Sequence, residues 1–404
     1  VYLYIMSPAL EALCRAWFDD EDGTIYTSLV GGSQSKTTEE NIALWELSRS
    51  VLRSPALLDL VRTSPDDQLL DAISASAHGA SFRAELDAFL EAYGHRGGAE
   101  RDAYHRRWRD NPAGVFQSVR LMVELDDEQS PAVHAQRQEA RMRDTKARCL
   151  ERLRAEPDEL GEFEWLARFH DLTGRPRTSR ADLFEWFVEH VQDWYFYRDF
   201  ERFYNDKNMA RNRYHLTGIG RKFEAAGLVH DEEDTFFLGK DEILAAAAGE
   251  LTARQVQTRV RVRRKVYEKY SRQEPPKYLR GWEPFDDDLV DAEGALAGIG
   301  ASTGVVTGVA RVCRDLSEIG KVRPGDILVT VATDPGWTTV FSIVSGVIVE
   351  TGGVVAHAVM ISREYGLPCV SNLSKACDSI PDGALITVNG STGRVVVHDE
   401  EGAA

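Results

Sequence analysis

The sequence has few cysteines and no long hydrophobic run. Its five cysteines are scattered over 404 residues, odd in number and without metal-ligand spacing, which suits a reducing cytoplasm better than a disulfide framework. The longest uncharged apolar stretch, TTVFSIVSGVIV, has about a dozen residues and is too short to span a bilayer. The opening VYLYIMSPALEAL has no basic region and an acidic run follows it, so no secretory signal is visible. We therefore expect a soluble, cytoplasmic protein.

The sequence also has fewer basic than acidic residues. The chain has 48 Lys and Arg against 65 Asp and Glu, and its formal net charge is −17. A chain this acidic is repelled by a phosphate backbone or an anionic membrane surface, so neither nucleic acid nor a membrane is an expected partner. The length exceeds what one hydrophobic core usually serves, and two or three domains are expected.

The first 271 residues predict a large all-α domain. Apolar residues recur at helical spacing in several segments, and Gly94 and Gly227 stand where C-terminal caps are expected. Asn111 and Pro112 mark a helix start. The helices that we expect cover residues 40–52, 80–94, 111–125, 132–156, 183–227 and 250–272, the fifth as one helix or two.

The composition changes after residue 271. Residues 272–294 contain Pro275, Pro276, Gly281 and Pro284 and predict a linker. Residues 295–400 are rich in Val, Ile, Thr and Gly and predict a small α/β domain, which makes the whole chain an α+β multidomain protein. Its expected strands are 304–313, 326–332, 341–350 and a hairpin over 384–398 that turns at Gly-Ser-Thr-Gly.

One histidine in the small domain stands at a chemically suggestive position. In TGGVVAHAVMISREYGLPC, the expected strand 341–350 is followed by Gly352 and Gly353, and a helix is expected from about Val355 to Tyr365 with Gly366 as its cap. His357 would then lie in the first helical turn, where unpaired N–H groups and the helix dipole favour phosphate. A neutral imidazole there is a nucleophile toward phosphorus. An isolated histidine is more often a packed core residue, but strand, glycine turn, histidine and capped helix together favour phosphate chemistry.

Residues 333–370 resemble the phosphohistidine swivelling domain of phosphoenolpyruvate (PEP)-utilising enzymes. This family includes PEP synthase, pyruvate phosphate dikinase and rifampin phosphotransferase, and the resemblance runs from about Gly300 to His398. It implies that residues 295–400 are the swivelling domain and that His357 is the catalytic carrier of a phosphoryl group. Ala356 departs from the family pattern, which has a hydroxyl or thiol residue there. The motif residues that match are Thr351, Gly352, Gly353, His357, Arg363, Glu364, Gly366 and Pro368, of which Thr351, Gly352, Gly353 and Arg363 are expected to support phosphate.

The helical domain is similar to the acceptor-binding region of rifampin phosphotransferase-like proteins. AYGHRGGAERDAYHRRWRDNP and IGRKFEAAGLVHDEEDTFFLGKDEI carry this resemblance, which implies that residues 1–271 bind the acceptor substrate. For each candidate residue, a surface salt bridge or an interhelical tie is the alternative. The candidates are His95, Arg96, Glu100 and Arg101, with Arg213 and His215 as weaker ones. A further group, which could wall an aromatic pocket but fits core packing better, is Trp194, Tyr195, Phe196, Tyr197, Phe200, Phe203 and Tyr204.

Two expected parts of such enzymes are missing from the sequence. There is no Gly-x-x-x-x-Gly-Lys-Ser/Thr loop, because GGSQSKTTE (31–39) lacks the glycine before Lys36 and predicts a helix entry instead. We find no ATP-grasp-like module and no PEP-binding barrel, and no metal-ligating set. The ATP-binding half is therefore expected on a separate subunit, which would bind ATP and Mg²⁺.

This split arrangement resembles the aryl phosphate synthases, which phosphorylate phenol or 4-alkylphenols such as p-cresol. The resemblance implies that His357 takes a phosphoryl group from ATP in the partner, with AMP and phosphate as the other products, and delivers it to a phenolic hydroxyl. The swivelling domain would move on the linker between the two sites. The alternatives are a fragment of a rifampin-type antibiotic phosphotransferase, a PEP synthase-like fragment, and a non-catalytic scaffold with a vestigial swivelling domain.

Overall fold

The computed structural model describes most of the chain, and it divides into two compact units. The described residues are 2–32, 35–98, 102–157, 179–273, 276, 278–285, 296–353 and 356–398. The larger unit consists of residues 1–93, 112–203 and 289–404, and the smaller unit of residues 94–111 and 204–288. Among the helices of the described part, none is both long and apolar enough to cross a membrane.

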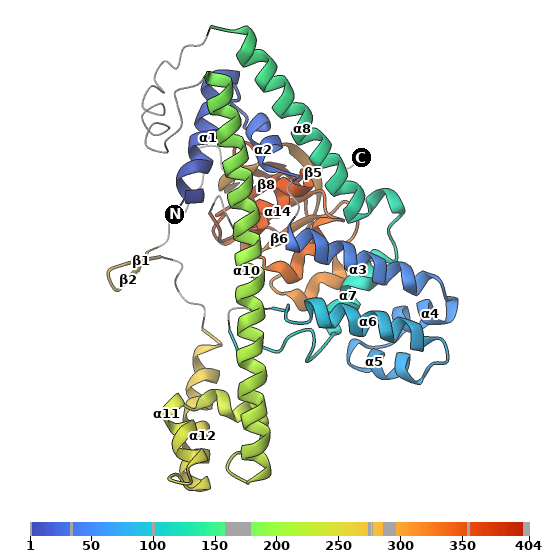
Figure 1. Ribbon diagram of the computed structural model, residues 1–404, viewed down its shortest axis with the longest axis vertical. Coiled ribbons are helices and arrows are strands. Elements are labelled where there is room, and N and C mark those ends of the chain that lie inside the picture. The colour runs from blue at the N-terminus through green and yellow to red at the C-terminus, as the bar shows by residue number, and fades with distance from the viewer. Residues whose placement is uncertain are drawn as a thin grey trace. The chain divides into compact units, whose positions relative to one another are not determined.

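The larger unit begins with a series of helices (Figure 1). They are α1 (Tyr2–Phe18), α2 (Thr24–Val30), α3 (Lys36–Leu52), α4 (Pro55–Thr63), α5 (Asp66–Ala75), α6 (Gly79–Tyr93), α7 (Ala113–Met122), the 3₁₀ turn η1 (Asp127–Gln129) and α8 (Pro131–Ala155). The hydroxyl of Ser35 accepts the Thr38 N–H, so the GGSQSKTTE segment is indeed a helix entry. Ser130 likewise caps α8, with Pro131 in its first turn.

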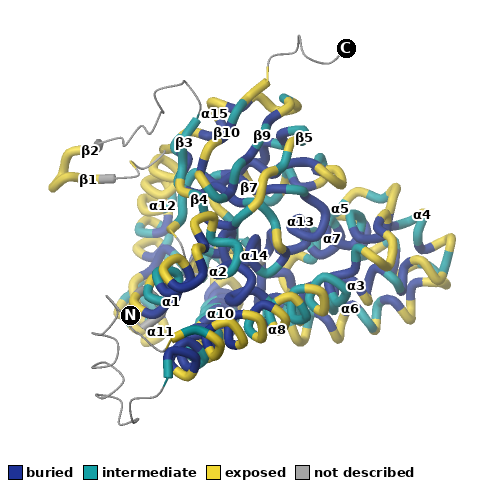
Figure 2. Tube along the Cα trace, turned by 90° about the horizontal axis from the view of Figure 1, so that it is seen from above, coloured by how far each residue is buried: buried dark blue, intermediate teal, exposed yellow. Residues whose placement is uncertain are grey.

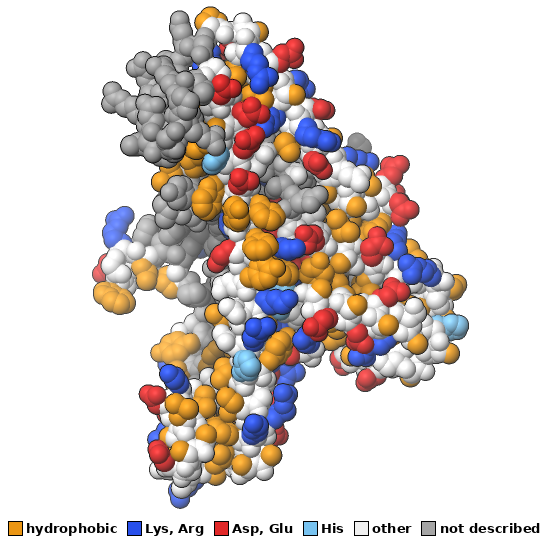
Figure 3. Space-filling model, viewed as in Figure 1, with side chains coloured by type: hydrophobic (Ala, Val, Ile, Leu, Met, Phe, Trp, Pro, Cys, Tyr) orange, Lys and Arg blue, Asp and Glu red, His pale blue; other side chains and the backbone are white. Residues whose placement is uncertain are grey.

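Helix α10 (Arg180–Ala225) is one continuous helix, not two. The chain leaves it at Gly227, whose φ of 69° is left-handed, as the cap prediction requires. The expectation that its aromatic cluster is core is wrong for most members, because only Tyr195 and Phe203 are buried. Figure 3 shows hydrophobic side chains gathered over the middle of α10. The exposed members are Trp194, Phe196, Tyr197, Phe200 and Tyr204.

The C-terminal part of the larger unit, called here the mobile part (residues 296–398), is built on one sheet. In the described residues eight strands have the order β3-β10-β9-β5-β6-β7-β8-β4. Strands β5 to β8 are parallel and the others antiparallel. The strands are β3 (Leu296–Ala297), β4 (Ile299–Ser302), β5 (Val305–Val312), β6 (Ile327–Thr330), β7 (Gly346–Val349), β8 (Cys369–Ser371), β9 (Leu385–Asn389) and β10 (Arg394–Val397).

Helices and turns complete the mobile part. They are η4 (Leu316–Lys321), η5 (Pro335–Trp337), α13 (Thr338–Phe341), α14 (His357–Tyr365) and α15 (Ala376–Ser379). The predicted strand 341–350 was too long, because α13 ends at Phe341 and β7 begins only at Gly346. The amides of Ile343 and Val344 both bond to the Val340 carbonyl, which makes this stretch a helical turn. An apolar run alone does not separate a buried helical turn from a buried strand.

Helix α14 lies between the sheet and the first helices of the chain. It packs against β4, β7 and β8 on one side and against α2 and α8 on another. It is buried along nearly its whole length (Figure 2). Met360 belongs to the same hydrophobic core as residues of α1, α2, α8 and α10. The mobile part thus shares one core with the helical part of the larger unit, residues 2–93 and 112–203.

The smaller unit is built on the C-terminal turns of α10. It contains η3 (Glu232–Phe237), α11 (Lys240–Ala247), α12 (Ala253–Tyr270) and a two-stranded hairpin of β1 (Tyr278–Arg280) and β2 (Glu283–Phe285). Its core joins Phe223, Val229, Phe237 and Val256 among others. The hairpin falls within the predicted linker 272–294, of which residues 274, 275, 277 and 286–294 lie outside the described residues.

Candidate functional site

His357 is the first residue of α14 and follows the turn after β7. Gly352 in that turn has a φ of 147°, and a Cβ added to it would lie 2.8 Å from the Cβ of Ala356. A side chain is therefore strained at this position. Gly366 closes the helix with a φ of 68°, as predicted. The turn and the cap together fix where α14 begins and ends, and so place His357 in its first turn.

The imidazole of His357 is held by a threonine that the sequence interpretation did not single out. The hydroxyl of Thr333 lies 2.9 Å from Nδ1 of His357. The ring of Phe341 meets the imidazole edge-on, with centroids 6.1 Å apart. The side chain is buried, with 7% of its surface exposed. Thr333 is the first residue of the stretch 333–370 that carries the resemblance, and this position could have marked it as a candidate.

Thr333 and His357 lie in two segments that each follow the carboxyl end of a strand, and these two strands are parallel neighbours. Thr333 comes after β6, and Thr351 and His357 come after β7, which pairs with β6 in parallel. The Thr351 amide and hydroxyl both donate to the Val331 carbonyl at 3.0 Å, which joins the two segments. In open α/β sheets this edge is where ligands bind.

Arg363 does not share the surroundings of the imidazole. Its Nε donates to the Ala301 carbonyl at 2.8 Å, and its Nη1 donates to the Tyr195 hydroxyl at 3.0 Å. Six residues of helix place it about 9 Å further along the axis than His357. Its guanidinium is 5.3 Å from the centre of the Tyr26 ring. Thr351, Gly352 and Gly353 thus precede His357 in the segment after β7, whereas the Arg363 side chain is directed to the helical part.

The predicted acceptor residues lie in the smaller unit, where Arg96 and Arg213 are held by other protein groups. His95 is buried, and Arg96 forms an ion pair with Asp206 at 3.3 Å in which both side chains are fully buried. His215 is exposed. Glu100 and Arg101 lie outside the described residues.

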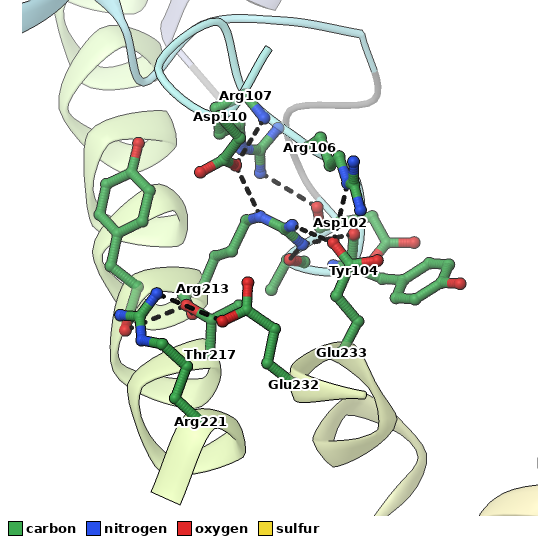
Figure 4. A network of polar contacts seen from close by, with 12 residues as sticks. Asp102, Tyr104, Arg106, Arg107, Asp110, Arg213, Thr217, Arg221, Glu232 and Glu233 are labelled. Atoms are coloured by element: carbon green, nitrogen blue, oxygen red, sulfur yellow. Dashed lines mark hydrogen bonds and ion pairs between the residues drawn. The ribbon is translucent and has the colours of Figure 1, made fainter. Parts of the chain in front are cut away.

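Arg213 is the centre of a polar network (Figure 4). Its Nε bonds to Asp110 at 2.8 Å, its Nη2 to Glu233 at 2.5 Å, and its Nη1 to the carbonyls of Ala103 and Tyr104. Burial alone would raise the pKa of Glu233, but hydrogen bonds from Arg106 and Arg213 outweigh it and hold that pKa below its usual range. This geometry ties the 102–110 segment to α10 and η3, as the interhelical alternative describes.

Across the described residues, no group of three or more His, Cys, Asp and Glu side chains is placed to hold a metal ion.

Comparison with known proteins bears on both parts of the chain. Residues 1–175 match the family described as the rifampicin phosphotransferase fourth domain. Residues 322–393, which include His357, match the mobile domain of PEP-utilising enzymes. These two matches support the PEP-utilising enzyme and rifampicin phosphotransferase family.

Similar curated proteins extend over nearly all of the chain. An uncharacterised phosphotransferase of Bacillus subtilis, YvkC, is 27% identical over 97% of this chain and 46% of its own length. A rifampicin phosphotransferase of Streptomyces sviceus is 30% identical over 89% of this chain and 40% of its own length. The prodigiosin synthesizing transferase PigC of Serratia marcescens is 26% identical over 91% of this chain and 39% of its own length. The chain therefore spans less than half the length of these relatives.

Proposed function

We propose that this chain carries a phosphoryl group on His357 and delivers it, in the cytoplasm, to the hydroxyl of a small aromatic acceptor. The observation that carries the proposal is the contact between Thr333 and Nδ1 of His357, within the segment that matches the mobile domain of PEP-utilising enzymes. The contact lies at the carboxyl ends of β6 and β7, which is the edge where ligands bind in open α/β sheets.

The Thr333 contact favours Nε2 as the ring nitrogen that reacts. When Nδ1 carries the proton and donates it to the Thr333 hydroxyl, the lone pair of the neutral ring is on Nε2. Nε2 then attacks phosphorus, an N–P bond forms and the P–O bond to the donor's leaving group breaks. The charge that develops on the ring is shared with Thr333 through Nδ1. Thr333 is thus a positioning residue for the nucleophile.

The start of α14 supplies donors for the transferred phosphoryl group. The first bond within the helix runs from the Met360 amide to the Ala356 carbonyl at 3.0 Å. The amides of the three preceding residues are those that a helix offers to caps or anions. Ala356 has no side-chain acceptor to compete for them. A phosphoryl oxygen on Nε2 would lie near this positive end of the helix dipole.

The second half-reaction transfers the phosphoryl group to the acceptor. The acceptor oxygen attacks phosphorus, the N–P bond to Nε2 breaks, and the hydroxyl proton passes to a base. A phenol has a pKa near 10, so a base assists the reaction. The predicted bases remain His95 and Glu100. Arg96 and Arg101 are predicted to neutralise charge on the phosphoryl group. Arg213 and His215 remain weaker candidates for the acceptor site.

The acceptor that we favour is phenol or a 4-alkylphenol such as p-cresol, as in the aryl phosphate synthases. ATP and Mg²⁺ are proposed to be bound mainly by a separate ATP-binding subunit, with AMP and phosphate as the other products. ATP supplies the phosphoryl group and Mg²⁺ neutralises its charge. A rifampicin-type acceptor is the second candidate, because the Streptomyces sviceus enzyme is similar over 89% of this chain.

Isotope exchange tests the carrier function without the ATP-binding partner. A carrier that forms a covalent intermediate exchanges the phosphoryl group between 4-cresyl phosphate and deuterated p-cresol, with no ATP present. We expect this exchange with the wild-type chain, seen by mass spectrometry, and none with His357→Ala. His78→Ala, which changes an exposed histidine outside the predicted sites, is the matched control. The same assay with rifampicin phosphate and labelled rifampicin separates the two acceptor candidates.

The outcomes distinguish the parts of the proposal. Exchange with rifampicin alone replaces the phenolic acceptor and leaves the carrier function intact. Equal exchange by wild type and His357→Ala overturns the carrier role of His357. Intact mass after incubation with a phosphorylated acceptor should show a phosphoryl-sized, acid-labile adduct in the wild type, and its absence together with absent exchange contradicts the function.

A further inference from the structure

Three consecutive residues near the end of α14 contact helices α2, α3, α8 and α10 of the helical part. Arg363 meets Tyr195 of α10 and Tyr26 of α2. The Glu364 carboxylate accepts from the Thr38 hydroxyl of α3 at 3.4 Å. Tyr365 is bonded by Asn41 of α3 and its ring packs on His134 of α8, with centroids 5.7 Å apart. These residues follow His357 by two helical turns, so whatever holds them also holds the carrier histidine in place.

Arg363 connects the two parts through different nitrogens. Its bond to the Ala301 carbonyl stays inside the mobile part, whereas its bond to the Tyr195 hydroxyl crosses to α10. The guanidinium is 5% exposed, and Tyr195 and Tyr26 are 4% exposed. If the mobile part moved away, the inner bond would persist and water would replace the outer one. The Arg363 guanidinium would therefore keep one of its hydrogen-bond partners in both the docked and the released state.

The close approach of the two backbones has a specific steric requirement. Gly31, the residue after α2, has an ordinary φ of −79°. A Cβ added to it would nevertheless lie 2.9 Å from the Arg363 carbonyl oxygen, closer than real Cβ atoms come. Gly31 thus permits α2 to meet the backbone of α14 directly. Any side chain there would wedge the two parts apart without straining its own backbone.

Most of these cross-contacts are polar. Hydroxyl, amide, carboxyl and guanidinium groups join α14 to α2, α3 and α10, and Met360 is the residue of α14 that enters the shared hydrophobic core. Permanent interfaces are mainly apolar, whereas polar ones of this kind exchange with water. The composition of these contacts at the end of α14 suits a local attachment that opens and closes.

We propose that Arg363, Glu364 and Tyr365 form a releasable latch that docks the mobile part on helices α2, α3, α8 and α10. This inference rests on the proposed function, because a carrier histidine must visit two sites. The latch holds His357 in one position, and its release allows the histidine to move to the other site. Tyr195, Asn41 and Gly31 are the receiving residues. They position the carrier and take no part in the chemistry.

The test measures docking directly, by the distance between two spin labels in the full chain. One label is placed at Asp59→Cys on α4 and the other at Thr392→Cys in the β9–β10 turn, both exposed positions. The five native cysteines are buried. We expect one narrow distance distribution with the wild-type latch. Tyr195→Phe, which removes only the hydroxyl, should lower the docked-to-released ratio roughly five-fold, and Gly31→Ala should lower it further.

Matched variants separate release from damage. Gly320→Ala adds a methyl group where nothing lies within 4 Å, and should leave the distances unchanged. An unchanged distribution in both Tyr195→Phe and Gly31→Ala overturns the latch. The latch is also overturned if the distance distribution broadens equally in Gly320→Ala and the Tm falls, because the variants then report a global loss of fold. If the two latch variants shift the distances as expected while the wild-type chain shows no phosphoryl exchange, the latch stands and the proposed function is rejected.

Discussion

The hydroxyl of Thr333 and Nδ1 of His357 are 2.9 Å apart, although 24 residues separate them in the chain. The parallel pairing of β6 with β7 brings them together, because each residue follows the carboxyl end of one of these strands. When Nδ1 donates to Thr333, Nε2 keeps the lone pair, and in the proposed function Nε2 is then the atom that attacks phosphorus. Removal of the contact should therefore change the chemistry more than the fold.

We expect Thr333→Val to slow phosphoryl exchange roughly 5- to 30-fold, with little change in Tm. The substitution keeps the shape of the side chain and removes one hydrogen bond of about 1–2 kcal/mol. Thr307→Val is the control, since Thr307 bonds to Thr387 on the exposed face of the sheet and removal of that hydroxyl is the same chemical change. Equal rates for the two variants would show that Thr333 does not position His357.

The two adjacent glycines before His357 should respond differently to alanine. Gly352→Ala is strained by its φ of 147° and by contact with Ala356, so we expect the free energy of unfolding to fall by roughly 1–3 kcal/mol. Nothing lies within 4 Å of a Cβ at Gly353, and Gly353→Ala should leave stability nearly unchanged. Chemical denaturation measures both values. Equal losses would contradict this view of the turn.

Gly353→Ala also tests the phosphate expectation for the turn. If the phosphoryl group approaches the backbone there, the added methyl group slows exchange while the free energy of unfolding stays the same. Unchanged exchange would remove Gly353 from the phosphate-binding residues and leave it as a turn residue.

Docking of the mobile part should weaken as the pH rises. Burial, followed by the charge of Asp199, raises the pKa of Glu364 to about 8 in the docked state, against smaller opposing effects of Thr38, Ser35 and Arg198. A released Glu364 has an ordinary pKa of about 4.3, so docking takes up a proton. The docked state is favoured most below the released pKa and loses this advantage as the pH rises through 8.

The spin-label distances at pH 6, 7, 8 and 9 measure this dependence. We expect the docked-to-released ratio to fall by up to roughly ten-fold per pH unit up to pH 8 and to level off above it. Glu364→Gln, which stays uncharged, should remain docked throughout. The other charged or titratable groups around Glu364 are Lys36 and Glu39 of α3, Arg198 and Asp199 of α10, and His134 and Glu139 of α8. A wild-type ratio that does not vary, or a Gln variant that follows it, contradicts the role of Glu364.

The sequence predicts the local elements of the site well and its long-range contacts poorly. Gly366 as cap, the hairpin at 384–398 and the helix entry at GGSQSKTTE were all predictable, because each depends on residues within one turn. The contact between Arg363 and Tyr195 joins residues 168 positions apart, and no spacing rule links them. The motif singles out Arg363 but does not predict the direction in which its side chain points.

Burial along α10 illustrates the same limit. Tyr195 and Phe196 are adjacent aromatic residues in one helix, yet one is 4% exposed and the other 38%. With aromatic residues on every face of this segment, the pattern does not reveal which face is covered. That depends on α14, α1 and α2, whose packing on α10 is a property of the tertiary structure.

Arg213 should prove to be a structural residue whose loss destabilises the smaller unit. Arg213→Lys cannot reproduce the bonds to Asp110, Glu233 and two backbone carbonyls. We expect the free energy of unfolding to fall by about 3 kcal/mol at pH 7. The pKa of Glu233 is held low by its arginine partners. This part of the stability is therefore present above the unfolded pKa and lost as the pH falls through the folded one, so the difference between variant and wild type shrinks in acid.

Comparison of the wild type with Arg213→Lys also distinguishes a structural role of Arg213 from a role in acceptor binding. Arg211→Lys, an exposed position two residues earlier in α10, is the control and should match the wild type. At a temperature where the Arg213→Lys chain is folded, a structural residue leaves the KM for the acceptor in the exchange assay unchanged. A KM raised ten-fold or more, with stability intact, would instead place the Arg213 guanidinium against the acceptor and overturn the structural interpretation.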